Sequence, residues 1–261
     1  MNAIRFQQSN TLVCLMSVDD DAGDRAALEL ARLFGSTCEA LLIVDPDPRL
    51  QQPTLAPPDR VLSRRSRKLS YLAREMGLSI QVEISELSPG LNRLRQQSRE
   101  TMTILMQPAH PLSRQTHTFR TVQLAAEQTL GATLFSPPVN VLSRDAILAI
   151  CLAPEDPAVD VARQLAAATH HPMEIIRPSR TTPHTATALA QDLSAWTGPR
   201  APSLIVMNRG ELLQAASDYS SLAARLNTPI LVVSAPNDSQ SNGDTPGRES
   251  KPNKTGDTGA T

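Results

Sequence analysis

The chain has 261 residues and a formal net charge of −1, with 40% hydrophobic, 20% charged and 3% aromatic residues. This length allows one large domain or two small ones, and the scarcity of aromatics means that any core is built mainly from Leu, Ile, Val and Ala. The near-neutral charge argues against nucleic acid or an anionic membrane surface as a partner. No apolar run approaches the roughly 20 residues that span a bilayer, and residues 1–10 lack the apolar stretch of a secretory signal. We therefore expect a cytoplasmic protein without membrane insertion.

Strand and helix patterns alternate from the start of the chain, which favours a mainly parallel sheet covered by helices. Thr11 to Val18 is a nearly continuous apolar run, typical of a central strand, and Asp19 to Asp21 end it. Five strands and four helices then complete one doubly wound α/β unit. Strands are predicted at 11–18, 39–44, 80–84, 103–106 and 133–135, and helices up to Gly35, at 59–76, around 91–94 and at 119–130.

The same pattern begins again in a shorter form. Strands are predicted at 146–152, 173–176, 204–207 and 230–233, and helices from Asp156-Pro157 to about 168, at 186–193 and at 212–226. One strand–helix pair of the first half is missing here. The sequence thus predicts two Rossmann-like doubly wound parallel-sheet units in tandem, residues 1–140 and 141–236, the second one truncated. Residues 237–261 are almost free of apolar side chains, which predicts a disordered tail.

The first half resembles the universal stress protein family through Ser17-Val18-Asp19-Asp20-Asp21 and the following Ala26–Ala31. The second half resembles that family more weakly, through Leu204–Met207 and Thr228–Val233. The resemblance implies a Rossmann-like five-stranded sheet and dimerisation through the last strand. It also implies that in tandem members the two halves pair in the same manner. Whether the halves of this chain pair internally or across a homodimer stays open.

ATP-binding members of that family share two features, which the resemblance brings to this chain. One is an Asp that ends the first strand and approaches the adenine, a position that Asp19 matches. The other is a loop after the fourth strand with the pattern Gly, two residues, Gly, nine residues, Gly, then Ser or Thr. Laid after Met106 without gaps, this pattern places Gln107, His110 and Arg120 on the glycines and Thr121 on the hydroxyl.

Glycines matter in such a loop because they let backbone N–H groups approach phosphate oxygens without a Cβ in the way. With all three replaced, we expect the usual phosphate cradle to be absent. In the second half, Leu152-Ala153 stands in place of the strand-end Asp, and Gly210 alone remains of the loop. Neither half keeps the nucleotide signature.

The loop from Gln107 to Thr121 is still the candidate ligand site, since open α/β sheets bind ligands at the carboxyl ends of their strands. Charged side chains can hold an anion there in place of the backbone. The alternative is a degenerate, solvated loop. The candidate ligand-binding residues are Asp19, Gln107, His110, Arg114, Arg120 and Thr121.

The remaining polar clusters have simpler explanations. The basic run Arg60, Arg64, Arg65, Arg67 and Lys68 is predicted to be the solvated face of a helix, with contact to an acidic partner as the alternative. His170-His171 are adjacent and do not share a helix face, so we expect no metal site there. Cys14 and Cys151 lie in apolar runs, which favours buried, reduced thiols. No Ser-His-Asp or Cys-His arrangement follows from the spacing, which argues against an enzyme.

We therefore expect a non-catalytic regulatory or scaffolding protein of the universal stress type, which acts through protein association and needs no cofactor. Its assembly would be a homodimer, or a monomer whose halves form an internal pseudo-dimer. The alternative is a protein that binds ATP, another adenine nucleotide or another anion in a modified pocket of the first half. A weaker alternative is a hydrolase or transferase with slow nucleotide hydrolysis.

Overall fold

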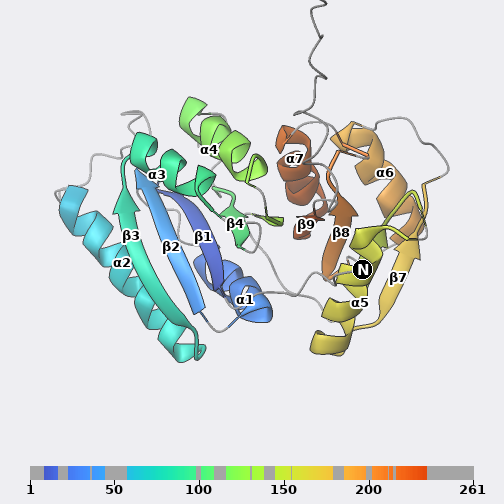
Figure 1. The fold of residues 1–261 in the computed structure, drawn as a ribbon, viewed down its shortest axis with the longest axis horizontal. Coiled ribbons are helices and arrows are strands. Elements are labelled where there is room, and N and C mark those ends of the chain that lie inside the picture. The colour runs from blue at the N-terminus through green and yellow to red at the C-terminus, as the bar shows by residue number, and fades with distance from the viewer. Residues whose placement is uncertain are drawn as a thin grey trace, which may run out of the picture.

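In a computed structural model, the chain forms one continuous sheet with the strand order β3-β2-β1-β4-β5-β9-β8-β6-β7 (Figure 1). All neighbouring strands are parallel except β5 and β9, which are antiparallel. The structure describes residues 9–16, 23–35, 37–44, 58–97, 101–108, 116–129, 131–137, 145–153, 155–178, 185–197, 202–210, 212–213 and 216–233.

The first half of the chain supplies one end of the sheet, in the order β3-β2-β1-β4-β5. This order, with a helix between successive strands, confirms the predicted doubly wound α/β pattern. The first half contains β1 (Ser9–Met16), α1 (Asp24–Phe34), β2 (Thr37–Val44), α2 (Pro58–Glu75), β3 (Ser79–Ser85), α3 (Leu87–Arg95), β4 (Met102–Met106), α4 (His117–Glu127) and β5 (Thr133–Ser136).

The second half supplies the other end of the sheet, in the order β9-β8-β6-β7. Between β2 and β4 the chain forms α2, β3 and α3, whereas among the described residues between β7 and β8 it forms α6 alone. In the described part of the second half, no counterpart of β3 with its helix is present. The second half contains β6 (Ile147–Ile150), α5 (Pro157–Thr169), β7 (Met173–Ile176), α6 (Ala186–Thr197), β8 (Leu204–Asn208), α7 (Ala216–Leu226) and β9 (Ile230–Val233).

Helices cover both faces of the sheet, each over its own apolar cluster. Leu30 of α1, Leu69 of α2 and Leu165 of α5 belong to one cluster. The other cluster is covered by α3, α4, α6 and α7 and includes Leu94 and Leu189. Each cluster contains residues from both halves, so the two halves share their cores on either side of the sheet. Most of these side chains are Leu, Ile, Val or Ala, as the composition requires.

The two halves meet where β5 pairs with β9, with Leu134 opposite Leu231. The last strand of each half therefore pairs with the last strand of the other half within one chain. Both edges of β5 and of β9 are therefore paired within the chain.

Local signals explain some element boundaries, and others differ from the prediction. Asp156 Oδ1 accepts a hydrogen bond from the Ala158 N–H at 2.7 Å, so it caps α5 as predicted. However, α4 begins at His117, earlier than predicted. Leu212, predicted to lie in the last helix, precedes α7 although it is buried.

Two of the three cysteines have described side chains. Cys38 and Cys151 are buried and form no disulfide, which fits the prediction of reduced thiols for Cys151. The side chain of Cys14, the predicted tail from 237 to 261, and the chain around the proposed domain boundary at 140 lie outside the described residues.

Candidate functional site

Gln107 follows β4 directly and stands at the first position of the predicted ligand loop. Its side chain is 1% exposed, and its Nε2 donates a hydrogen bond to the carbonyl oxygen of Ser220 at 3.0 Å. Ser220 lies on α7 of the second half. The Gln107 amide therefore joins the end of β4 to α7 and contributes to the contact between the halves.

Arg209 holds the matching place in the second half, directly after β8. The backbone N–H of Gln107 donates to the Ser136 carbonyl at the end of β5, at 3.3 Å. The backbone N–H of Arg209 donates in the same way to the Val233 carbonyl at the end of β9, at 2.8 Å. The two residues thus occupy equivalent positions around the β5–β9 pair.

The Arg209 guanidinium closes the carboxyl end of α4 in the first half. It donates hydrogen bonds to the carbonyl oxygens of Glu127, of Thr129 at 3.0 Å and of Gly131 at 3.1 Å. The last carbonyls of a helix have no partner inside the helix, and a cation beside them is favourable. Gln107 and Arg209 therefore make reciprocal contacts, because Gln107 reaches α7, which follows β8, and Arg209 reaches the end of α4, which follows β4.

An aromatic pair closes the same contact. Tyr219 of α7 stacks on Phe135 of β5, with ring centroids 5.6 Å apart and 18° between the ring planes. The Tyr219 hydroxyl donates to the Leu213 carbonyl at 2.9 Å and accepts from the Gly210 N–H at 3.0 Å. Burial raises the pKa of the Tyr219 phenol above its ordinary value, although the Gly210 hydrogen bond opposes this shift. The contact between the halves is thus apolar at its centre, and hydrogen bonds of Gln107, Arg209 and Tyr219 surround it.

Thr116 is the N-cap residue of α4, and the sequence did not predict this role. Its Oγ1 accepts a hydrogen bond from the Phe119 N–H at 3.1 Å, the geometry of an N-cap. Thr121 lies inside the helix instead, and its Oγ1 donates to the His117 carbonyl at 2.8 Å. The hydroxyl at the helix start therefore comes nine positions after Gln107, whereas the family pattern places its hydroxyl fourteen positions after the first glycine.

The structure describes three of the six predicted ligand-binding residues: Gln107, Arg120 and Thr121. Arg120 is exposed on the second turn of α4, next to Thr121. Within the described part of the chain, neither residue makes a hydrogen bond or ion pair with Gln107, whose amide is directed to α7. Asp19, His110 and Arg114 lie outside the described residues.

A buried ion pair lies near the carboxyl end of β1. Asp24, the first residue of α1, is 0% exposed, and its Oδ1 accepts a hydrogen bond from Nη2 of Arg65 on α2 at 2.8 Å. Arg65 itself is only 7% exposed, so the prediction of a solvated basic run is wrong for this residue. At about 100° per residue, Arg65 lies on the same side of α2 as Leu69, four residues on, and the Asp24 carboxylate compensates its buried charge. Its position four residues before an inward-facing Leu is the sequence signal that could have placed it.

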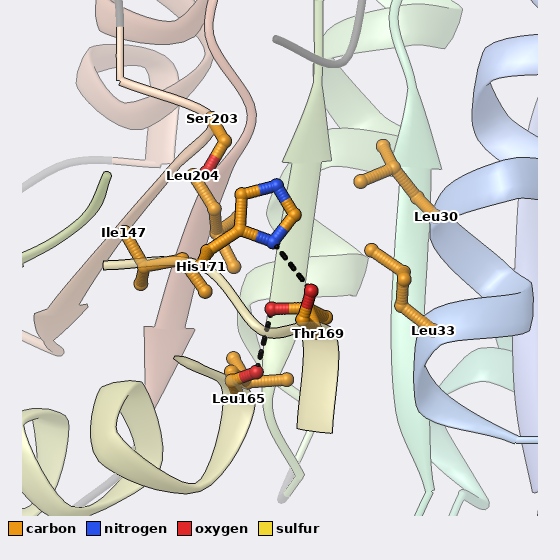
Figure 2. A pocket seen from close by; sticks show the side chains of 8 residues that line it. All are labelled: Leu30, Leu33, Ile147, Leu165, Thr169, His171, Ser203 and Leu204. Atoms are coloured by element: carbon orange, nitrogen blue, oxygen red, sulfur yellow. Dashed lines mark hydrogen bonds between the residues drawn. The ribbon is translucent and has the colours of Figure 1, made fainter. Parts of the chain in front are cut away.

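Figure 2 shows a small hollow between the halves, lined by eight residues. Leu30 and Leu33 of α1 form one side, and Leu165 of α5 lies on the other. Among the polar groups that line the hollow, the Thr169 hydroxyl donates a hydrogen bond to the Leu165 carbonyl at 2.7 Å. Ile147 and Leu204 place the hollow at the amino ends of β6 and β8, whereas open α/β sheets bind ligands at the carboxyl ends.

Two further properties concern metals and membranes. In the described part of the chain, no group of three or more His, Cys, Asp or Glu side chains is placed to hold a metal ion. Of the helices formed by these residues, none is both long enough and apolar enough to cross a membrane.

Two solved structures resemble the chain over most of its length. A universal stress protein from Archaeoglobus fulgidus DSM 4304 matches with a TM-score of 0.55 and 12% identity, over 88% of this chain and 98% of that one. A putative universal stress protein from Pseudomonas aeruginosa UCBPP-PA14 matches with a TM-score of 0.50 and 12% identity, over 89% of this chain and 95% of that one. This chain has the universal stress protein fold.

Because the first match covers 88% of the chain, the universal stress protein fold takes in residues of both halves. At 12% identity the likeness concerns the fold and not the binding residues. No protein-family model and no curated protein matches the chain.

Proposed function

We propose that the chain is a non-catalytic protein of the universal stress type that regulates or scaffolds through protein association and does not bind ATP in the manner of the glycine-loop members. The proposal needs no cofactor and no reaction. It rests on the fold and on the described residues at the two ends of the connection between β4 and α4, Gln107 and Thr116.

The environment of Gln107 carries the proposal. A phosphate cradle needs several backbone N–H groups that point to one place, together with glycines that leave room for the phosphate oxygens. Here Thr121, at the hydroxyl position of the family pattern, lies inside α4 and bonds to the His117 carbonyl. The first loop position holds a buried Gln whose amide bonds to α7. Both observations support the loss of the cradle.

Association would use surfaces other than the last strands. β5 and β9 pair with each other inside the chain, so a second copy cannot extend the sheet at either strand. The outer strands β3 and β7 and the outer helices remain as candidate contact surfaces for a protein partner or for a homodimer.

Calorimetric titration with MgATP tests the first part of the proposal. We expect no saturable heat from this chain, whereas a universal stress protein with the complete glycine pattern, titrated in parallel, should bind. Saturable ATP binding by this chain would refute the proposal. Proximity labelling in native cells tests the second part: we expect a reproducible protein neighbour or self-labelling, and a chain that labels neither contradicts association.

The competing function is an anion site formed by side chains of Asp19, Gln107, His110, Arg114, Arg120 and Thr121. One observation favours it: Arg120 is exposed near the N-terminus of α4 and makes no ion pair with any described residue. A guanidinium placed there can bind a phosphate or carboxylate through charge-assisted hydrogen bonds. If phosphate or a nucleotide raises the melting temperature, and Arg120→Gln together with Arg114→Gln removes that effect, the anion site replaces the scaffold as the better explanation.

A further inference from the structure

One helix face on the outside of the first half carries an unusual row of cations. α2 lies at the end of the sheet away from the second half, and Leu69 and Ala73 bury its inner side (Figure 1). Its outer side consists of exposed residues, which we call the basic face. The basic face comprises Arg60, Arg64, Arg67, Lys68, Tyr71 and Arg74.

The basic face has a regular spacing. Counted from Arg60, the row proceeds by four, three, four and three residues through Arg64, Arg67 and Tyr71 to Arg74. At 3.6 residues per turn these five side chains lie within an arc of about 80°, and at 1.5 Å per residue they extend over about 21 Å. They form a straight row along the helix rather than a scattered set.

Little on the protein neutralises this row. Arg60, Arg64 and Arg74 make no ion pair with any described residue. Glu75, next to the row, is already engaged, since its Oε2 lies 3.5 Å from Nη2 of Arg25. The hydrogen bond to Glu75 also raises the pKa of the Tyr71 phenol, which is 62% exposed in the middle of the row. The positive charges of Arg60, Arg64 and Arg74 are therefore available to a partner.

The geometry favours an α-helix as that partner. Carboxylates at the same four-three steps on one face of a partner helix repeat with the same rise along the helix axis, so they can face this row over its whole length. Opposite charges on facing helices set partner choice. A membrane would need apolar anchors, and Tyr71 is the one large apolar side chain on this face. Nucleic acid binding would be expected with a strongly basic surface, whereas the whole chain has a net charge of −1.

We propose that the basic face of α2 binds an acidic helix of a partner protein whose carboxylates repeat at the same four-three spacing. This inference rests on the proposed association function and specifies the partner's chemistry. Among the described residues of the second half, no counterpart of α2 lies between β7 and α6. The inner side of α2, fixed by the Arg65–Asp24 pair, holds the row in place.

A designed pair of peptides tests the inference with the full chain. The probe is a fluorescent helical peptide with Glu at four-three spacing, and its control has the same composition with the Glu residues spread around the helix. Fluorescence anisotropy at low salt should show tighter binding of the spaced peptide, with an affinity that falls as salt rises. Equal affinity for the two peptides, or no binding of either, overturns the inference.

Variants locate the site. R64Q/R67Q/R74Q should lower the affinity for the spaced peptide by roughly tenfold, since each exposed ion pair contributes little and the three act together. The matched control, R95Q/R177Q/R225Q, removes three exposed arginines elsewhere and should leave the affinity unchanged. Melting curves of both variants check that the fold is intact. An equal loss in both variants, or a preference of the wild type for single-stranded DNA or phosphatidylserine vesicles over the peptide, overturns the inference.

The outcomes separate this inference from the proposed function. Saturable binding of MgATP in the calorimetric titration refutes the proposed function whatever the peptides do. A different result refutes only the inference about the basic face: the chain does not bind MgATP, a neighbour is found in cells, and the spaced peptide binds no better than its control. The proposed function then stands.

Discussion

The two halves follow the same strand order from the centre of the sheet outward, yet they differ at its two ends. Ala40 of β2 and Ile175 of β7 occupy matching places, and their surroundings show the difference. Ala40 is 1% exposed within the cluster that α2 covers, whereas Ile175 is 47% exposed. The match follows from the strand registers. From the centre outward, the paired residues of the first half are Leu134, Ile104, Leu12 and Ala40. The paired residues of the second half are Leu231, Val206, Ala149 and Ile175.

This difference shows what the missing strand and helix do in the first half. β3 pairs with the outer edge of β2, and α2 contributes to the cluster over its face. Without counterparts, β7 becomes the edge of the sheet and presents an apolar side chain. β7 is only four residues long, which limits its use as a template for another strand. The fold therefore tolerates the loss at its outer end.

At the centre of the sheet, the two halves differ in their contacts and not in their strands. Gln107 and Arg209 occupy matching places. Gln107 donates one side-chain hydrogen bond, whereas Arg209 donates several to carbonyl oxygens at the end of α4. The halves are thus joined by unlike contacts at equivalent positions, so the two sides of the contact are not interchangeable. The predictions below separate the centre of the sheet, where changes should be costly, from its outer end.

At the contact between the halves, the largest effect is expected at Tyr219. Tyr219→Ala should lower the free energy of unfolding by about 4 kcal/mol, because it removes a fully buried ring and leaves a cavity beside Phe135. Tyr219→Phe keeps the stack and loses only the hydroxyl bonds, at a cost of about 1–2 kcal/mol. Urea unfolding followed by circular dichroism measures both. Equal losses in the two variants would show that the hydroxyl network, not the stack, holds the halves together.

A smaller and unequal effect is expected at the two matching positions. Arg209→Ala should cost about 3 kcal/mol, because three carbonyls at the end of α4 lose a charged donor. Gln107→Ala should cost about 1 kcal/mol, since one neutral hydrogen bond to Ser220 is lost. The same unfolding experiment ranks them. A larger loss at Gln107 than at Arg209 would reverse the asymmetry described here.

The order of elements could be predicted from the sequence because periodicity and apolar runs are local signals. The shortened second half followed from the short chain between Met173–Ile176 and Leu204–Met207, which has room for one helix. The predicted start of α4 was late because the helix signal begins at Phe119, whereas the cap is a Thr in a polar stretch with no Glu or Gln at the third helical position. Helix ends of this kind are set by a single hydrogen bond.

The candidate site was less predictable because its contacts are not local. Gln107 and Ser220 are 113 positions apart, and Arg209 reaches carbonyls more than 75 positions away. Nothing in the residues around Gln107 indicates that its amide is directed to another helix rather than to a ligand. Arg65 differs, because its place among inward-facing residues of α2 was visible in the sequence, and only its partner Asp24 was not.

The smallest effect is expected at the outer end, and it tests the comparison most directly. Ile175→Lys should change the free energy of unfolding by no more than about 0.5 kcal/mol, because a half-exposed side chain on an edge strand loses little burial. The matched change in the first half, Ala40→Lys, should cost more than about 3 kcal/mol or prevent folding, because it places an ammonium group in a fully buried position. Thermal and urea unfolding of the two variants measure the contrast. A loss above about 2 kcal/mol for Ile175→Lys would mean that another part of the chain covers β7 as α2 covers β2, and the two halves would then differ in the source of their cover rather than in its presence.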